Sequence, residues 1–415
     1  MLCSEAMVSM RSIRSRGGLA TVLLVALVAA GCSRREWTTA IEPLPNPAAP
    51  GSFEPQLTGS GDDVVLSWVE RDGETATLKF STRTATGWSD PLTVASGDDW
   101  FLSYADVPSV TRLTNGTLLA QWLRATDPLI EAYDLLLAYS TDEGRTWSAP
   151  FMPHDDGTLT QHGFAALVEL PDGVGVVWLD GRAVELDTTS PDGGAMSVRY
   201  AAFDRSWNRV ADLLIDDRVC ECCPLAAAVT SEGVITAYRD RSATEVRDIS
   251  MSRLAGGAWT PPSTVHDDGW EIAACPVNGP MLSADGREVA AAWFTVEGNQ
   301  GQSYAAFSSD AGRTWGEPIR LDDQGSLGRV DVELLEDGSA IALWIEFADG
   351  GSQLRMRRIE PSGARSAAFT VSALPEGRTS GYPRVARAGD QLLFAWTEST
   401  GDGATAVRTA VADLP

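Results

Sequence analysis

Two segments of the chain share one pattern: residues 140–147 read STDEGRTW, and residues 308–315 read SSDAGRTW. Both fit S-x-D-x-G-x-T-W, a spacing typical of a sharp turn between two strands. The aspartate can accept hydrogen bonds from the amides of its own turn, and glycine tolerates a positive φ. The tryptophan then leads into the next strand, where its ring packs between sheets. The two segments therefore predict hairpins at equivalent places in a repeated unit.

Beyond residue 50 a longer pattern recurs: a short strand, a turn, and an apolar strand that ends in an aromatic residue. Successive aromatic residues are 51 to 60 positions apart, enough for a blade of four strands. They are Trp68, Trp122, Trp178, Tyr238, Trp293, Trp344 and Trp396. The sequence thus predicts an all-β propeller with seven four-stranded blades, or six if the first repeat is irregular.

The last repeat ends at Pro415 without a fourth strand. Residues 36–44, EWTTAIEPL, resemble the fourth strand of other repeats, so we expect them to complete the last blade and close the ring. The expected organisation is a signal peptide at 1–31, a lipidated N-terminus with the closing strand at 32–50, and the propeller at 51–415.

The two turns and the repeat resemble the Asp-box (BNR) repeats of the sialidase-like β-propeller superfamily. The resemblance implies the propeller fold but no single function, because Asp boxes occur in hydrolases, lectins and assembly factors alike. The segment YADVPS, 104–109, looks like the sialidase Y-R-I-P-S segment, whose arginine helps to clamp the substrate carboxylate. Asp106 stands at the arginine position and repels an anion. We therefore expect weak or no sialic-acid hydrolysis.

The N-terminal segment has the features of an export signal. Three arginines precede a short apolar run, 19–30, which is too short to span a membrane stably. Its ending, VAAGC at 28–32, resembles a bacterial lipobox, in which the cysteine is lipidated. We expect Cys32 to anchor the protein in the bacterial cell envelope, facing the periplasm or the exterior.

The charge balance restricts the partners of the protein. The formal net charge is −25, from 57 acidic and 32 basic residues. Such a surface repels phosphate backbones, so nucleic-acid binding is excluded. We expect a monomer that contacts the membrane only through its lipid anchor and whose partner is a glycan or a polar small molecule.

In a propeller the first strands begin and the second strands end on one face, opposite the Asp-box turns. This geometry assigns to one face the candidate acid–base groups Asp106, Asp180, Asp240, Glu245 and Tyr382. The candidate ligand-binding groups there are His162, Arg182, Arg239, Arg241, Arg247 and Trp270. Two alternatives stay open for 238–248, YRDRSATEVRD: an internal salt-bridge network or a polar pocket. His154 and His266 each begin an HDDG segment and are interpreted as turn caps.

Four cysteines follow the lipobox: Cys220, Cys222, Cys223 and Cys275. Export favours disulfides, a vicinal Cys222–Cys223 bond and a Cys220–Cys275 bond between neighbouring blades. The alternative is a copper or zinc site in which His162 joins Cys222, Cys223 or Cys275.

Three functions follow from these features. The leading hypothesis is a lipid-anchored propeller that binds or hydrolyses a saccharide or similar polar ligand at the channel mouth. The resemblance implies a glycoside hydrolase of the exo-α-sialidase type, which needs two carboxyl groups. The alternatives are a surface or periplasmic lipoprotein that binds copper or zinc, and a scaffold without catalysis.

We predict that Cys32 carries the lipid. Changing Cys32→Ser should release the protein from the membrane fraction or block its maturation, because the acceptor thiol is lost. Metabolic labelling with a radioactive fatty acid measures the modification, and label that persists in the variant would contradict the assignment.

Overall fold

The computed structural model describes residues 39–59, 64–127, 130–184, 194–375, 377–401 and 403–414. Every regular element within these ranges is a β-strand, and none of the described residues belongs to a helix able to cross a membrane. The signal segment and Cys32 lie outside the described residues.

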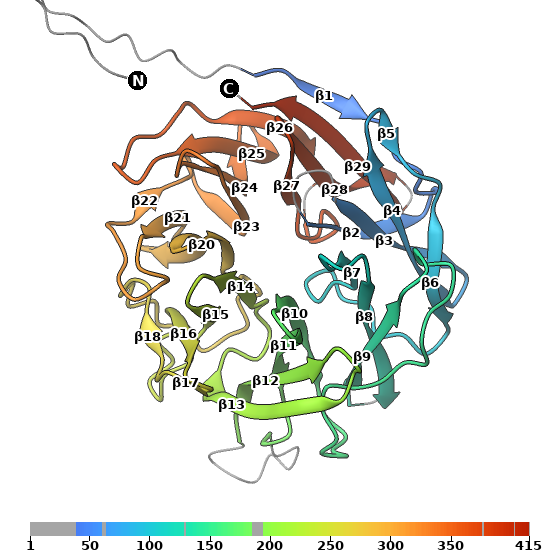
Figure 1. The fold of residues 1–415 in the computed structure, drawn as a ribbon. Helices are drawn as coiled ribbons and strands as arrows, with labels where there is room; N and C mark the ends of the chain where they lie inside the picture. The colour runs from blue at the N-terminus through green and yellow to red at the C-terminus, as the bar shows by residue number, and fades with distance from the viewer. Residues whose placement is uncertain are drawn as a thin grey trace, which may run out of the picture. The chain divides into compact units, whose positions relative to one another are not determined.

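The strands form seven antiparallel sheets, which are arranged as the blades of a ring (Figure 1). Blade 1 contains β2 (Ser52–Thr58), β3 (Val65–Asp72), β4 (Thr75–Thr84), β5 (Gly87–Trp88) and β6 (Leu92–Gly97). Blade 2 contains β7 (Ser109–Arg112), β8 (Leu118–Asp127) and β9 (Ala132–Ser140). Blade 3 contains β10 (His162–Leu170), β11 (Gly173–Asp180), β12 (Met196–Asp204) and β13 (Arg209–Val219).

Blade 4 contains β14 (Ala226–Thr230), β15 (Gly233–Arg239), β16 (Ile249–Ala255), β17 (Ala258–Trp259) and β18 (Ser263–Thr264). Blade 5 contains β19 (Met281–Asp285), β20 (Glu288–Glu297), β21 (Gln300–Ser308) and β22 (Ile319–Arg320). Blade 6 contains β23 (Ser326–Leu334), β24 (Ala340–Ala348), β25 (Gly351–Ile359) and β26 (Phe369–Leu374). Blade 7 contains β27 (Arg384–Ala388), β28 (Gln391–Gly401), β29 (Ala404–Asp413) and β1 (Ile41–Leu44).

The prediction of seven blades and of closure by an N-terminal strand is confirmed. β1 pairs with β29 in antiparallel register from Ile41↔Ala412 to Leu44↔Thr409. The Thr409 hydroxyl also donates to the carbonyl of Leu44 at 2.5 Å. The expected strand began at residue 36, but residues 36–38 lie outside the described ones. Pairing the two ends of the chain covers the edge of blade 7.

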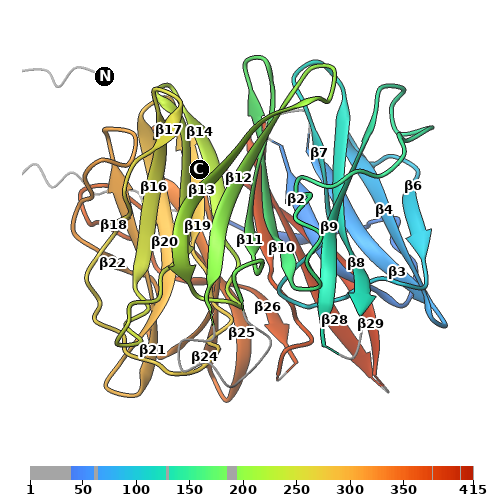
Figure 2. The same ribbon diagram turned by 90° about the horizontal axis from the view of Figure 1, so that it is seen from below.

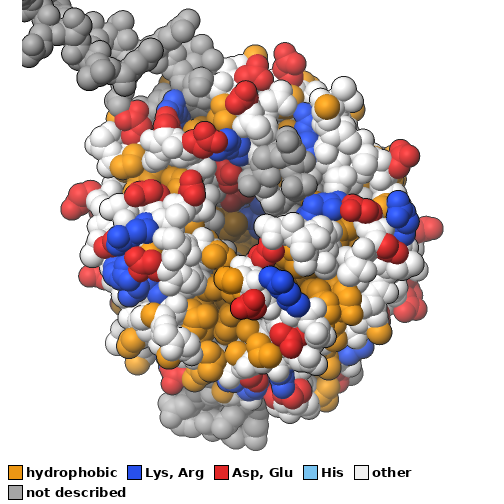
Figure 3. Space-filling view, in the orientation of Figure 1, with side chains coloured by type: hydrophobic (Ala, Val, Ile, Leu, Met, Phe, Trp, Pro, Cys, Tyr) orange, Lys and Arg blue, Asp and Glu red, His pale blue; other side chains and the backbone are white. Residues whose placement is uncertain are grey.

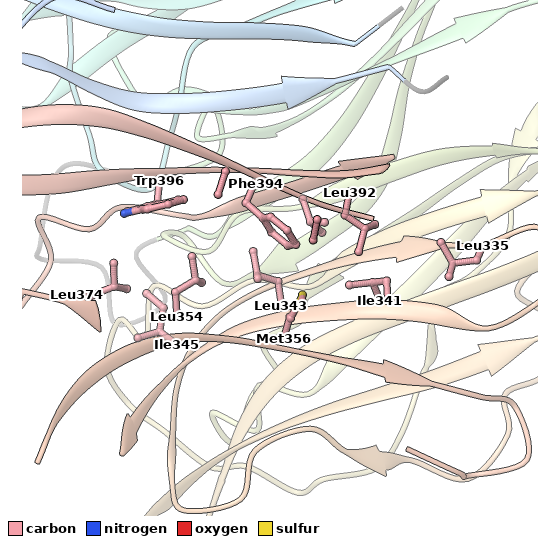
Figure 4. Close-up of a cluster of buried hydrophobic side chains, with 13 residues drawn as sticks. Leu335, Ile341, Leu343, Ile345, Leu354, Met356, Leu374, Leu392, Phe394 and Trp396 are labelled. Carbon is pink, nitrogen blue, oxygen red and sulfur yellow. The ribbon is translucent and has the colours of Figure 1, made fainter. Parts of the chain in front are cut away.

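The core lies between neighbouring blades. The predicted central aromatic residues are all buried, and Trp68, Trp178 and Trp344 are fully enclosed. Figure 4 shows one such layer, in which Leu343 and Met356 of blade 6 face Phe394 and Leu392 of blade 7. Each sheet is thus apolar on both faces, which explains why its inner strands lack strict alternation of polar residues.

The two S-x-D-x-G-x-T-W turns make equivalent hydrogen bonds. In the first, Asp142 accepts the backbone N–H of Thr146 at 2.9 Å and its hydroxyl at 2.7 Å. Asp310 accepts the same two bonds from Thr314 at the same distances. The glycines have φ of 79° at Gly144 and 76° at Gly312, the conformation that requires glycine.

Deleting residues 33–44 should lower the free energy of unfolding by several kcal/mol. The variant loses the β1–β29 ladder and the packing of Ile41 and Leu44 against blade 7. Urea unfolding of the full chain and the variant measures the difference. Equal unfolding free energies would refute ring closure by β1.

Candidate functional site

The strand order defines one face of the ring as the site face. Each blade is antiparallel, so its first strand begins where its second strand ends, and the loops between blades lie at the same end. Figure 2 shows the strands running between the two faces. Figure 3 shows one face of the ring, where acidic side chains are spread around a central hollow. We call the face where first strands begin the channel-mouth face.

A cavity of about 470 Å³ opens on the channel-mouth face between blades 1 and 7. Backbone and side chains from the start of β2, the end of β3 and the β28–β29 turn line it. Its polar and aromatic lining includes Glu54, Arg71, Tyr104, Thr379 and Thr397. It has the size and mixed lining of a ligand site.

Three inner strands are interrupted by bulges close to the channel mouth. The register of β2, β10 and β23 shifts at these points. In each bulge one non-glycine residue has a left-handed backbone: Glu54 with φ 52°, Phe164 with φ 52° and Arg329 with φ 53°. Such conformations are costly for side chains with a Cβ, and they cluster at functional sites. The bulges change the direction in which the side chains of these residues leave the strand near the channel.

Two carboxyl groups from different blades are buried beside each other there. Glu54 is 6% exposed and Asp106 is 2% exposed. Burial, together with the charge of Asp106, raises the pKa of Glu54 well above its usual value. Burial raises the pKa of Asp106 to about 7, although a backbone hydrogen bond from Phe164 opposes the rise. The raised pKa favours the protonated form of Glu54, which is the form that can donate a proton.

Close packing holds Asp106 in place. A Cβ at Gly163 would lie 2.1 Å from Asp106 Oδ2, so only glycine fits beside the carboxyl group. Among the described residues, Asp106 Oδ2 and Glu54 Oε2 have no hydrogen-bond partner. Unsatisfied buried oxygens cost stability, so each requires an explanation, such as a catalytic role or a bound water molecule or ion.

Two arginines lie against the ring of Tyr104, which lines the cavity. The guanidinium carbon of Arg329 lies 5.4 Å and that of Arg378 5.5 Å from the centre of the Tyr104 ring. Arg329 also donates to the hydroxyl of Ser380 at 2.7 Å and to the carbonyl of Gly377 at 3.1 Å, which fixes its side chain. Arg378 is exposed beside the same ring.

Blade 3 and the loop that precedes it contain a second cluster. The rings of His154 and His162 are stacked, with centres 3.8 Å apart. Asp156 and Asp180 lie beside them. Burial and the neighbouring His162 lower the pKa of His154 to about 4, so its ring is neutral at pH 7. His154 is thus part of a buried cluster and not an exposed turn cap.

The cysteines pair differently from both expected disulfides. Cys222 is bonded to Cys275, which links blades 4 and 5. Cys220 and Cys223 are buried free thiols whose sulfur atoms lie 2.8 Å apart. Among the described residues, no set of three or more potential metal ligands within 4.8 Å contains both His162 and a cysteine. The structure therefore does not bring together the mixed copper or zinc set expected from sequence.

The charged segment of blade 4 forms internal interactions. Arg239 is buried and donates to the carbonyls of Asn278, Arg247 and Phe294 at 2.6 to 2.8 Å. Glu245 accepts hydrogen bonds from Arg241 and Arg247, which lower its pKa to about 2. Of the two alternatives for this segment, the geometry favours the salt-bridge network.

The remaining candidates are also engaged by protein groups. Asp240 accepts from the hydroxyl of Ser250 at 2.8 Å. Tyr382 is buried and donates to the carbonyl of Val277 at 2.5 Å. Trp270 is buried beneath the guanidinium of Arg239, 4.8 Å away, so it offers no open platform. Two of the candidates adjoin residues that line the cavity: Asp106 interacts with Glu54, and Tyr382 directly follows Gly381.

Sequence reasoning missed Glu54, Tyr104 and Arg329 as site residues. One signal was available: Glu54-Pro55 in β2 and Asp106-Val-Pro108 before β7 are acidic residues at the entrances to neighbouring first strands. Comparing first-strand entrances across the repeats would have suggested a pair of carboxyl groups.

Comparisons with known proteins identify the fold. No protein-family profile and no curated protein sequence matches the chain. The polysaccharide lyase Uly1 is similar in structure, with a TM-score of 0.52, 8% identity, and coverage of 87% of this chain and 90% of that one. The endosialidase of phage phi92 is similar with a TM-score of 0.51 and 8% identity, over 91% of this chain and 69% of that one. The chain therefore has a sialidase-like propeller fold.

The raised pKa of Asp106 predicts a pH dependence of stability. Between about pH 4 and pH 7 the folded state holds a proton that the unfolded state releases, so stability falls as pH rises through this window. The slope approaches about 1.4 kcal/mol per pH unit. Urea unfolding from pH 4 to pH 8 should show a shallower decline for Asp106→Asn. Asp90→Asn, at an exposed position between β5 and β6, is the control, and identical slopes for the two variants would contradict the assignment.

Proposed function

We propose that the protein binds a saccharide in the cavity between blades 1 and 7 and cleaves a glycosidic bond there. The observation that carries this proposal is the pair Glu54 and Asp106, two neighbouring buried carboxyl groups, of which Glu54 lines an open cavity and has a raised pKa. A proton donor is required because an alkoxide is a poor leaving group at neutral pH.

The cavity lining supports a sugar as the ligand. The ring of Tyr104 offers an aromatic face, and aromatic faces pack against the apolar faces of sugar rings. Arg71 and Arg378 are exposed near this ring and would pair with carboxylate or sulfate groups on an acidic saccharide. The two structural neighbours named above are a polysaccharide lyase and an endosialidase.

Glu54 is the proposed general acid, and Asp106 is a positioning residue. Burial, together with the charge of Asp106, raises the pKa of Glu54, and the bulge in β2 places Glu54 at the cavity wall. Asp106 stands where the sialidase clamp has arginine, and Arg239 has its donors occupied by backbone carbonyls. We therefore propose a substrate other than a simple terminal sialoside.

The cellular location is part of the same proposal. Lipidation of Cys32 would hold the propeller at the envelope of a bacterium, where polysaccharides are encountered before uptake. The proposed partner is thus an extracellular or periplasmic glycan.

Changing Glu54→Gln should lower the rate of cleavage by roughly 10²–10⁴-fold, because the amide cannot donate the proton. Binding of the polymer should be nearly unchanged, since the side chain keeps its size. Incubation with a panel of acidic and neutral polysaccharides is followed by new reducing ends, and by ultraviolet absorbance if cleavage occurs by elimination.

The matched control is Glu143→Gln. Glu143 is an exposed glutamate in the turn between β9 and Trp147, on the opposite face, and the same change should leave cleavage unaffected. Full activity of Glu54→Gln, or equal losses in both variants, would overturn the assignment of Glu54. Binding without cleavage by the unmodified protein would reduce the function to saccharide recognition.

A further inference from the structure

Four cysteine sulfurs gather where the chain passes from blade 3 to blade 4. Cys220 directly follows β13, and Cys222 and Cys223 lie between it and β14. Cys222 is bonded to Cys275, which precedes β19 of blade 5, whereas Cys220 and Cys223 are free thiols. None of the four is among the described residues that line the cavity, so the cluster is separate from the proposed saccharide site.

The two free thiols are placed to bond to each other. Their sulfur atoms lie 2.8 Å apart, and both residues are 1% exposed. A disulfide has a sulfur–sulfur distance of about 2.0 Å, so a relative movement of less than about 1 Å closes the bond. The spacing C-x-x-C at 220–223 is also that of redox-active dithiols. Cys220 and Cys223 are therefore a pair that can form a disulfide.

The disulfide that already exists lies within reach of this pair. Cys220 Sγ is 3.8 Å from Cys222 Sγ. Cys222 is half-buried, and its partner Cys275 is exposed. The sulfur atoms thus form a continuous path from solvent at Cys275, through Cys222 and Cys220, to the buried Cys223.

The surroundings of Cys220 favour its thiolate. Nη1 of Arg247 donates to Cys220 Sγ at 3.4 Å. Burial raises the pKa of Cys220, but a hydrogen bond with Cys223 opposes this effect. The backbone N–H of Cys222 and the charge of Arg239 act in the same direction as that bond, and the pKa of Cys220 ends below its usual value. Burial and the neighbouring Cys220 raise the pKa of Cys223. Because the thiolate is the form that attacks a disulfide, Cys220 is the nucleophile of the pair.

We propose that the four cysteines form a thiol–disulfide exchange centre, through which Cys220 and Cys223 become a second disulfide. The Cys220 thiolate attacks Cys222 Sγ, which forms a Cys220–Cys222 bond and releases Cys275 as a thiolate. Cys223 then attacks Cys220 Sγ, which forms the Cys220–Cys223 bond and releases Cys222. The proton lost by Cys220 passes through solvent to Cys275, and the proton of Cys223 passes to Cys222.

An external disulfide completes the reaction at the exposed end of the path. Cys275 attacks it and forms a mixed disulfide, which releases one external thiol. Cys222 then attacks Cys275 Sγ, restores the Cys222–Cys275 bond and releases the second external thiol. Two electrons have passed from Cys220 and Cys223 to the external disulfide, and the protein holds two disulfides. Oxidising compartments outside the cytoplasm supply such disulfides.

The exchange takes place beside a segment that supports the cavity wall. Cys275 begins residues 275–278, whose carbonyl at Val277 accepts a hydrogen bond from the Tyr382 hydroxyl at 2.5 Å. Asn278 Oδ1 accepts from the backbone N–H of Arg329 at 2.8 Å, and Arg329 lies against the aromatic ring of the cavity. Restoring the Cys222–Cys275 bond therefore keeps this segment fastened to blade 4.

The test is thiol mapping of the full-length protein, which is reduced with dithiothreitol, desalted and incubated with glutathione disulfide. Cleavage after arginine leaves three of the cysteines in peptide 219–239 and Cys275 in peptide 254–287. After denaturation and maleimide labelling, mass spectrometry should find the two peptides joined and unlabelled, because all four sulfurs are bonded. Two labels on the joined peptides, or glutathione that stays on peptide 219–239, would overturn the proposal.

A second cut, after Glu221, distinguishes the pairings. With bonds Cys220–Cys223 and Cys222–Cys275 all fragments stay joined. Bonds Cys220–Cys275 and Cys222–Cys223 would release the fragment that begins at Cys222, and that result would overturn the proposal.

The variant Cys222→Ser tests the path of exchange. Its peptide 219–239 should become lighter by two hydrogen atoms without joining peptide 254–287, because Cys220 and Cys223 still pair. The rate should fall at least about tenfold, since the external disulfide must reach the buried Cys220 directly. Ala274→Ser, at the exposed position beside Cys275, is the matched control and should keep the unmodified rate.

Oxidation of the pair in Cys222→Ser at the unmodified rate would overturn the exchange centre, because Cys222 would then take no part. Joined peptides in this variant would also overturn it. Circular dichroism verifies that both variants are folded. These measurements count thiols and bonds, so their outcome is independent of saccharide cleavage.

Discussion

The fold depends on one large buried aromatic residue in each central strand, and in three of the seven blades its indole N–H donates to a carboxylate on the same strand. The indole of Trp178 donates to Asp180, that of Trp68 to Glu70 and that of Trp344 to Glu346, always two residues further along the strand. The alternation of a strand puts residues i and i+2 on the same face, so the pattern needs no special loop. It lets a large ring fill the space between blades while its polar N–H stays satisfied.

The same bond brings acidic groups to the channel-mouth face. The second strand of each blade ends at this face. The carboxylate lies two residues after the tryptophan and is therefore nearer to that end of the strand. In blade 3 the consequence is Asp180, held in one orientation by Trp178 and placed opposite His162 in the register. Packing of Trp178 and pairing with Arg182 therefore fix the carboxylate of Asp180 at this end of blade 3.

Backbone strain near the channel comes from the bulges in the first strands. The bulges of β2, β10 and β23 leave Glu54, Phe164 and Arg329 with left-handed backbones, conformations that the surrounding sheets must stabilise. The first strand of each blade pairs with the second strand along one edge, and its other edge faces the channel. An extra residue in the first strand therefore disturbs only one ladder. The proposed proton donor and the arginine beside Tyr104 both occupy such positions.

The sequence by itself determined the repeat, the number of blades, closure by the N-terminal strand and the end of the ring at which rare residues gather. These properties follow from the spacing of the repeats and from the alternation of strand direction, and both can be read from the sequence. Only the tertiary structure decided which residues meet at that end. Cys222 pairs with Cys275, His162 meets His154, and Glu54 meets Asp106 across two blades. The reason is physical: such contacts depend on bulges, on loop paths and on the angle between blades, which act over a few ångströms and leave no period in the sequence.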